Sequence, residues 1–273
     1  MCVILLVVVA SFRKWLALLS VFLKDGIAYR VNGIIWILTD AFTMFTMPLV
    51  WMSAMGTNTV AGFGRADIVK YYLAMLMVSG FVVCHFMWEL SIEIKDGQFA
   101  SQLVRPISVY QVYFFRNLSW RMVRMSLCVP FLLLFMWFYR DILHGVSFNW
   151  SGGFWLALIL GHLLSFTTVM MLGFIALFVE EAMALFELYY FPMLFLSGQV
   201  VPVAMLPVWA QTLAKYLPFY YTTNLPVDIG IGRVTGQTVW TGLLVQCLYI
   251  GLTFAVSKLL WAKGLRQFSG VGL

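Results

Sequence analysis

A succession of apolar runs, most of them about twenty residues long, limits what this chain can fold into. Hydrophobic residues make up 63% of its 273 residues and charged residues only 10%, whereas soluble domains carry about 25% charged residues. The chain therefore cannot cover a water-facing globule with polar side chains. In lipid the backbone must satisfy its own hydrogen bonds, which leaves helices or closed barrels, and runs of this length favour helices.

The apolar runs predict an all-α polytopic membrane protein that forms one transmembrane domain over residues 1–273. Six spans are expected, at Gly33–Met55, Ile68–Leu90, Val112–Tyr139, Phe154–Val179, Ala182–Leu196 and Val239–Trp261. Ahead of them, residues 11–30 mix basic and large apolar residues, which is typical of an amphipathic helix at the membrane surface. The apolar residues 1–10 precede Arg13 and Lys14, the reverse of the order in a signal peptide, and we assign them no function.

Basic residues orient the predicted spans. With both termini on the inner side, that side receives twelve of the 17 lysines and arginines. Because loops rich in Lys and Arg stay in the cytoplasm, we expect a multi-pass protein of a cell membrane, the plasma membrane of a bacterium, with both termini cytoplasmic. The net charge of +6 is then a topology signal and does not indicate a nucleic-acid partner.

The segment 91–108, SIEIKDGQFASQLVRPIS, is a compact charged island between the second and third predicted spans. Its charges gain nothing in lipid, so we expect them to lie in water, on the cytoplasmic side. A solvated connecting loop is the ordinary fate of such a segment. Gly97 permits a bend and Pro106 can start or stop a helix, features that any loop would also use.

The segment 197–233, which begins with Ser197 and Gly198, is too apolar for an ordinary loop. Four prolines divide it into pieces that are too short to cross a membrane: Pro202, Pro207, Pro218 and Pro226. Irregular backbone at membrane depth needs protein around it. We therefore expect short helices that re-enter the outer leaflet between spans five and six.

Four segments carry a family resemblance, in the order LKDGIAYRVN, EIKDGQFASQLVRPIS, FLSGQVVPVAMLPVWAQTLAKYLPFYYTTNLPVDIGIGRVTG and LWAKGLRQFSGVG. They resemble segments of the ABC-2 type permeases, the membrane subunits of a class of ABC exporters. The first is similar to the opening interfacial helix and the second to the cytosolic segment between spans two and three. The third is similar to the outer re-entrant region, and the fourth to the closing segment of one uncharacterised subgroup.

The resemblance implies a non-catalytic subunit that pairs with a second permease, identical or a sibling, and with two nucleotide-binding ATPase subunits. ATP and Mg²⁺ would then bind to the ATPase and no cofactor to this chain. The island would form a coupling helix seated in a groove of the ATPase. Its contact or positioning residues would be Glu93, Lys95, Asp96, Gly97, Gln98, Arg105 and Pro106. Members of the family export drugs, lipids or glycans.

Charged residues inside the predicted spans are functional candidates, because a charge at the bilayer centre costs about 2.5–3.5 kcal/mol. We expect Arg121 and Arg124, with Arg116, to lie near the headgroups and reach anionic lipid, or to face protein. The alternative is gating or substrate contact, which would place Arg121 and Arg124 in the translocation path. We expect Glu187 to pair with Arg121 or Arg124, or else to bind a cation in the translocation path, and Asp40 is treated in the same way. Such an aromatic, acid-containing path would suit a hydrophobic or cationic substrate.

Other functions find little support in the sequence. No GxxxxGK[ST] motif is present to cradle phosphates, and the four isolated cysteines indicate neither disulfides nor zinc. His85 and Glu89 have i,i+4 spacing but no third ligand nearby, so no metal site is predicted. The alternatives are a secondary transporter or channel that works without ATP, which inverted repeats would support, and an intramembrane enzyme, which would need a catalytic cluster.

Overall fold

The computed structural model describes residues 2–179 and 181–268, with side chains from Arg13 onward except at residue 32. Within these ranges the chain is helical and forms no strand, apart from one isolated bridge between Val60 and Phe63. The all-α prediction is therefore confirmed. In chain order the helices are α1 (Cys2–Ala28), α2 (Arg30–Met55), α3 (Arg65–Val82), α4 (Met87–Lys95), α5 (Phe99–Leu103), α6 (Val109–Phe138), α7 (Arg140–Leu143), α8 (Gly152–Gly173), η1 (Phe174–Leu177), α9 (Ala182–Leu196), η2 (Val203–Met205), α10 (Val208–Tyr216), η3 (Tyr220–Asn224), α11 (Leu225–Gly230) and α12 (Gln237–Gln267).

Five segments are long and apolar enough to cross a membrane, and α9 is a sixth, shorter apolar helix. The five are Gly33–Met55, Arg65–Lys95, Val109–Phe138, Gly152–Leu177 and Gln237–Gln267. They coincide with five of the six predicted spans and differ at the ends by a few residues. The chain is thus a multi-pass membrane protein by the length and composition of its helices.

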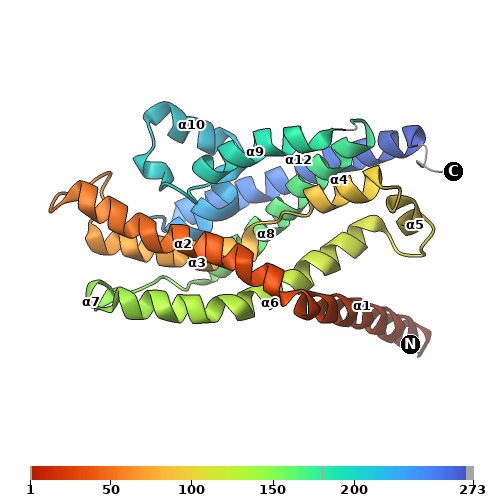
Figure 1. The fold of residues 1–273 in the computed structure, drawn as a ribbon, viewed down its shortest axis with the longest axis horizontal. Helices are drawn as coiled ribbons and strands as arrows, with labels where there is room; N and C mark the ends of the chain where they lie inside the picture. The colour runs from red at the N-terminus through yellow and green to blue at the C-terminus, as the bar shows by residue number, and fades with distance from the viewer. Residues whose placement is uncertain (1, 180, 269–273) are drawn as a thin grey trace.

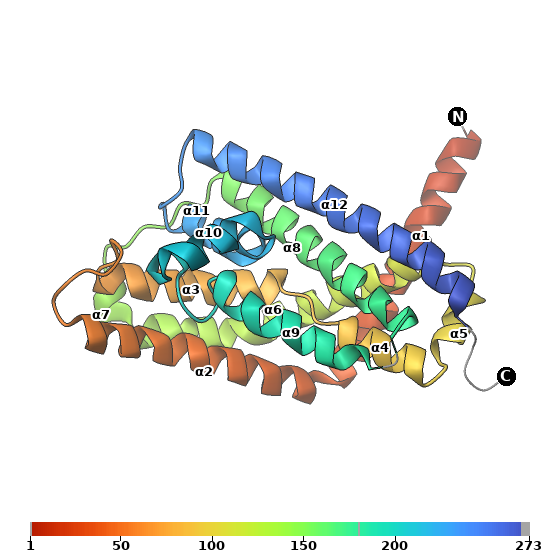
Figure 2. The same cartoon turned by 90° about the horizontal axis from the view of Figure 1, so that it is seen from above.

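The long helices lie side by side in an elongated bundle with α3 and α8 at its centre (Figures 1 and 2). In the spans that contain α3 and α8, 72% and 67% of the most apolar window is buried, against 28% or less in the spans of α2, α6 and α12. The outer helices expose large apolar side chains, such as Phe42, Leu133 and Leu248. Lipid is the solvent that such surfaces require.

The first helix is longer than the interfacial helix predicted over residues 11–30. It begins at Cys2 and ends at Ala28, so the apolar start of the chain continues into it. α1 packs along α6, where Ser119 Oγ donates to Leu19 O at 3.2 Å. Gly26 lies directly against Val123 and Trp120, which allows the two helices to approach closely.

The second predicted span, Ile68–Leu90, is wrong as a continuous helix. Residues 83–86 are not helical and separate α3 from α4. A break inside a membrane needs partners for its free backbone groups, and Ser165 of α8 supplies one, because its Oγ accepts from Cys84 N at 2.9 Å. Cys84 Sγ also donates to Asn117 Oδ1 of α6 at 3.3 Å. Polar side chains from two neighbouring helices therefore stabilise the break.

The segment 197–233 folds into the short pieces expected from its prolines, which are η2, α10, η3 and α11. Pro202 and Pro207 directly precede η2 and α10. Pro226 instead lies in the first turn of α11, which continues directly from the π-helix η3. Because Pro226 has no N–H, Tyr221 O five residues earlier is free to accept from Gln246 Nε2 of α12 at 2.8 Å.

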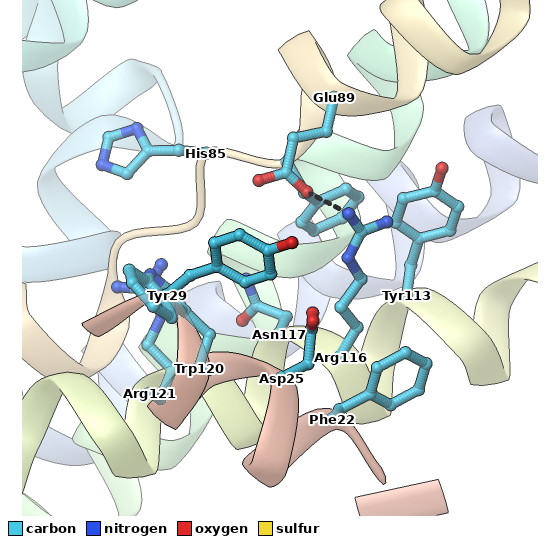
Figure 3. Close-up of a pocket in the computed structure, with 12 residues that line it drawn as sticks. Phe22, Asp25, Tyr29, His85, Glu89, Tyr113, Arg116, Asn117, Trp120 and Arg121 are labelled. Carbon is cyan, nitrogen blue, oxygen red and sulfur yellow. Dashed lines mark ion pairs between the residues drawn. The ribbon is translucent and has the colours of Figure 1, made fainter. Parts of the chain in front are cut away.

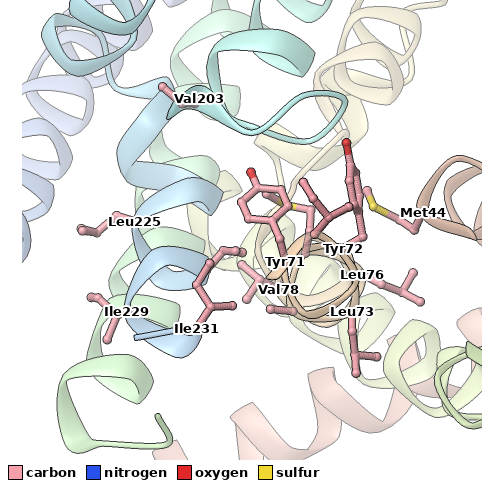
Figure 4. Packing of buried hydrophobic residues seen from close by; sticks show 14 of the residues in the cluster. Met44, Tyr71, Tyr72, Leu73, Leu76, Val78, Val203, Leu225, Ile229 and Ile231 are labelled. Atoms are coloured by element: carbon pink, nitrogen blue, oxygen red, sulfur yellow. The ribbon is translucent and has the colours of Figure 1, made fainter. Parts of the chain in front are cut away.

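Two tyrosines of α3 fasten this segment to the core (Figure 4). Both are fully buried, and Tyr72 OH donates to Val200 O at 2.7 Å. Tyr71 OH lies 2.7 Å from Gly198 O and 2.8 Å from Asn224 Oδ1. Gly198 has a φ of +81°, and a Cβ there would lie 2.3 Å from Tyr71 OH and 2.2 Å from Asn224 Oδ1. Only glycine fits this turn.

The substitution Gly198→Ala should therefore destabilise the protein. We expect a loss of more than about 1 kcal/mol, because alanine is strained at positive φ and its methyl group collides with the Tyr71–Asn224 bond. Gly251→Ala is the matched control, since Gly251 is inside α12 with open space around it. Thermal unfolding of the detergent-solubilised protein should show a lower Tm for the first variant and an equal or higher Tm for the control. Equal Tm values for Gly198→Ala and the wild type would contradict this account of the turn.

Candidate functional site

The charged island folds as two short helices joined by a tight turn. α4 ends at Lys95, Asp96 follows it, and Gly97 turns the chain with a φ of +73° into α5. Phe99 is fully buried and packs edge-on against Trp261 at 6.0 Å and Phe268 at 5.7 Å between ring centroids. This contact attaches α5 to the last turns of α12 and fixes the island at one end of the bundle.

The residues on both sides of α5 are mostly exposed. Asp96, Gln98, Arg105 and Pro106 are all exposed, as is the apolar Val104 at 84%. α5 lies at the same end of the molecule as the C-terminal end of α12, opposite to α7 and α10 (Figures 1 and 2). The exposed residues of the island thus form a projecting surface that another molecule can reach.

Glu93 points the other way and joins three helices. Its carboxylate accepts from Tyr113 OH at 2.5 Å and from Arg116 NH1 at 2.8 Å, both on α6, and from Gln102 Nε2 of α5. Only 15% of its side chain is exposed. Among the residues predicted for coupling, Glu93 is therefore placed to position the island and not to contact a partner.

Lys95 connects the island to the turn before α9. Its Nζ lies 2.9 Å from Glu181 Oε1, and both side chains are exposed. Glu181 lies in that turn, directly before α9. Beside this ion pair a cavity of about 500 Å³ opens between α4, the residues after η1 and the end of α12. Three segments distant in sequence therefore share one end of the molecule.

A second cavity, of about 280 Å³, lies between α1, the break at residues 83–86 and α6 (Figure 3). Asp25 and Tyr29 line it from the end of α1, Glu89 from α4, and Arg116 and Arg121 from α6. Glu89 Oε2 lies 3.1 Å from Arg116 NH2, so Arg116 bridges the two acids Glu89 and Glu93 of α4.

All three arginines of α6 face protein groups. Arg121 and Arg124 are 1% and 6% exposed, and Arg116 is held by its two carboxylates. The expected pair of Glu187 with Arg121 or Arg124 is wrong. Arg124 is paired with Asp40 of α2, while Glu187 is exposed on α9 and forms no ion pair among the described residues.

The positions of the polar residues in the sequence of α6 indicate that the helix has one polar face. Asn117, Arg121 and Arg124 recur at i, i+4 and i+7, which places them on one side of a helix. All three are buried. The cavity residues Asp25, Tyr29 and Asn117 themselves were not predicted, because they come together only through the packing of α1 on α6.

His85 and Glu89 do not form a helical i,i+4 pair, because the break at residues 83–86 precedes α4. In Figure 3 the His85 ring points away from Glu89, and it packs against Tyr190 at 5.8 Å between ring centroids. Among residues 2–179 and 181–268, no group of three or more His, Cys, Asp or Glu side chains is arranged to hold a metal ion.

At the opposite end of the bundle, the partly buried carboxylate of Asp228 organises the segment 197–233. Asp228 Oδ2 accepts from Asn224 Nδ2 at 2.6 Å and from Tyr220 OH at 3.0 Å. Burial raises the pKa of Asp228 to about 6, although these two hydrogen bonds and the charge of Arg233 oppose the shift. Asn224 also binds Tyr71, so this carboxylate extends the contacts that hold Gly198.

The geometry predicts unequal roles for two neighbouring charges of the island. Glu93→Ala leaves Tyr113, Arg116 and Gln102 without their shared acceptor and should cost about 1.5–3 kcal/mol of folding stability. Lys95→Ala removes an exposed ion pair, which is worth about 0.2–1 kcal/mol. Denaturant titration of the solubilised protein, followed by tryptophan fluorescence, measures both. Equal losses in the two variants would show that Glu93 does not join the three helices.

Comparisons with known proteins agree with the resemblance noted above. A family model described as an ABC-2 family transporter protein matches residues 34–272. The Nodulation protein J of Rhizobium leguminosarum bv. viciae is 38% identical over 76 residues, which are 28% of this chain and 29% of that relative. The protein of the same name from R. leguminosarum bv. trifolii is 39% identical over 75 residues, 27% of this chain and 28% of the relative.

The similarity to these curated relatives spans less than a third of their length, whereas the family match covers most of this chain. It includes the charged island, the break at residues 83–86, the arginines of α6 and the segment 197–233. By this match, and by its long apolar helices, the chain belongs to the ABC-2 family of transporter membrane proteins.

Proposed function

We propose that this chain is the membrane-spanning permease subunit of an ATP-driven exporter. It would work with a second permease, identical or a sibling, and with two separate ATPase subunits that bind ATP and Mg²⁺. The observation that carries the proposal is the projecting surface of the island, with Asp96 and Gln98 before α5 and Arg105 after it, on a chain of the ABC-2 family. The bond network of Glu93 behind this surface would transmit a push on it into α6.

The proposed topology has six crossings, with α9 as the fifth. α9 has 15 residues, which is about 22 Å of helix and less than the roughly 30 Å of a hydrocarbon core. The short helices of the segment 197–233 directly follow α9 and would occupy the depth of the outer leaflet that it leaves unfilled. Six crossings would place the island and both termini in the cytoplasm, which agrees with the distribution of basic residues.

Three ends of the chain's helices would then face the ATPase together. The island, the turn with Glu181 and the end of α12 are joined by the Lys95–Glu181 ion pair and by the packing of Phe99 on Trp261. A partner that contacts Asp96 and Arg105 would therefore also lie near the turn between η1 and α9.

Affinity purification of the tagged full chain from the membranes of its native host tests the proposal. We expect a soluble ATPase with a GxxxxGK[ST] motif to purify with it in equal amount. Substrate transport into vesicles that continues without ATP would instead identify an ion-coupled transporter or a channel. Transporters built from inverted repeats carry broken helices in matching pairs. The break between α3 and α4 alone is therefore not a sign of such a repeat.

Charge reversal on the island should uncouple the two subunits. In the purified complex, Asp96→Lys combined with Arg105→Glu should lower transport-stimulated ATPase activity at least tenfold, while the chain still inserts and folds, because both side chains are exposed. Arg140→Glu combined with Asp141→Lys is the matched control, since these residues form an exposed ion pair of 3.7 Å at the opposite end. ATPase stimulation that survives the island reversal would contradict the coupling role.

A further inference from the structure

The acidic side chains that line the cavity between α1 and α6 are exposed, whereas Arg121 in the same cavity is buried. Asp25 is exposed and Glu89 has 56% of its side chain exposed, so the two acids stand at the mouth. Arg121 is 1% exposed and lies on the wall formed by α6 (Figure 3). Glu89 is already paired with Arg116. The buried cation of Arg121 and the exposed anion of Asp25 therefore line one cavity without an ion pair between them.

Arg121 is poorly satisfied by the protein itself. Its NH1 makes one long hydrogen bond, of 3.3 Å to Gly80 O, and its Nε is buried without a hydrogen-bond partner. Across the described part of the chain, no carboxylate forms an ion pair with it, in contrast to Arg116 and Arg124. An arginine keeps its charge in any protein environment. A buried cation of this kind is stabilised when an anion binds to it.

The neighbours of Arg121 add a second donor and apolar walls. Asn117 lines the cavity, and because its Oδ1 already accepts from Cys84, its amide NH₂ is left as a donor. Phe22, Tyr29 and Trp120 line the same space. A guanidinium beside an amide suits a phosphate or carboxylate, since arginine binds both in a bidentate manner. Aromatic walls suit the apolar part of the same ligand.

Charge and volume restrict the ligand further. The formal charges of the two acids and two arginines that line the cavity sum to zero. A singly charged anion is therefore repelled less by Asp25 than a doubly charged one. A volume of about 280 Å³ is at the lower limit of ligand pockets, which measure about 300–1,000 Å³. The cavity therefore fits a headgroup, while apolar chains would lie outside it along the exposed apolar faces of α1 and α2.

We infer that this cavity binds the singly charged phosphate or carboxylate group of an amphiphile, with Arg121 as its anchor and Asn117 as a second donor. Membrane phospholipids and free anions share this chemistry. Binding does not depend on an ATPase partner, so the inference stands or falls separately from the proposed function.

Thermal unfolding of the purified full chain in neutral detergent, with three probes, tests the inference. Short-chain phosphatidylglycerol carries the anion on a lipid, inorganic phosphate is the anion alone, and the matching diacylglycerol is the lipid without the anion. We expect a saturable rise in Tm with phosphatidylglycerol at a concentration at least tenfold below that needed with phosphate. Equal effects of the first two probes would identify a soluble anion as the ligand. An equal effect of diacylglycerol would overturn the anion site.

Variants locate the effect. Arg121→Gln should weaken phosphatidylglycerol binding at least tenfold, and Arg121→Lys, which keeps the charge, should weaken it less. Asp25→Asn should strengthen binding several-fold, because it removes the repelling acid at the mouth; a purely structural role of the cavity does not predict this gain. Arg140→Gln, which removes an exposed charge at the other end, is the control. Unchanged binding in both Arg121→Lys and Asp25→Asn would refute the assignment even if Arg121→Gln failed to fold.

Discussion

The fold depends on keeping the arginines of α6 inside an apolar bundle. Three cations on one helix cannot be left in hydrocarbon, where each unpaired charge costs several kcal/mol. Two of them are met by carboxylates from other helices, Arg116 by Glu89 and Glu93 of α4 and Arg124 by Asp40 of α2. These ion pairs fix α2 and α4 against α6. The one arginine without such a pair, Arg121, stands beside the cavity.

The break at residues 83–86 follows from the same need for polar partners. A continuous helix from Arg65 to Lys95 could not both run through the centre of the bundle and bring Glu89 and Glu93 to α6. The interruption redirects α4, and its free backbone is met by Ser165 of α8. Polar groups of α6 and α8 thus accumulate around the break. The cavity lies beside this break and is lined by residues of the break, α1, α4 and α6.

The sequence was sufficient to predict what depends on composition along one stretch of chain. Apolar length located five spans and α9, and prolines located the short helices after Gly198. Features that depend on distant partners were missed. The stretch containing Cys84 and His85 has neither Pro nor Gly, so nothing local indicates a break, and Ser165 is 81 residues away. Both Glu187 and Asp40 were expected to pair with Arg121 or Arg124, and the sequence did not decide between them; the packing of α2 on α6 brings Asp40 to Arg124, 84 residues away in the chain.

The charged island illustrates the same limit within a single segment. Its sequence indicated a surface for a partner, and Asp96 and Arg105 are indeed exposed. Glu93 has the same composition signal but faces inward, because it is one helical turn from Glu89 and both reach Arg116. The segment therefore has an outer side that a partner can contact and an inner side that is bonded to α6.

This two-sided arrangement is compatible with the proposed coupling role of the island. Coupling between sites needs a contiguous set of contacts that can change together. Here α5 is bonded to Glu93 through Gln102, and Glu93 shares Arg116 with Glu89, which lines the cavity. A displacement of α5 by a bound partner would strain the Glu93 bonds first and the Glu89–Arg116 pair next. Three side-chain contacts, Gln102–Glu93, Glu93–Arg116 and Arg116–Glu89, therefore connect α5 to the mouth of the cavity.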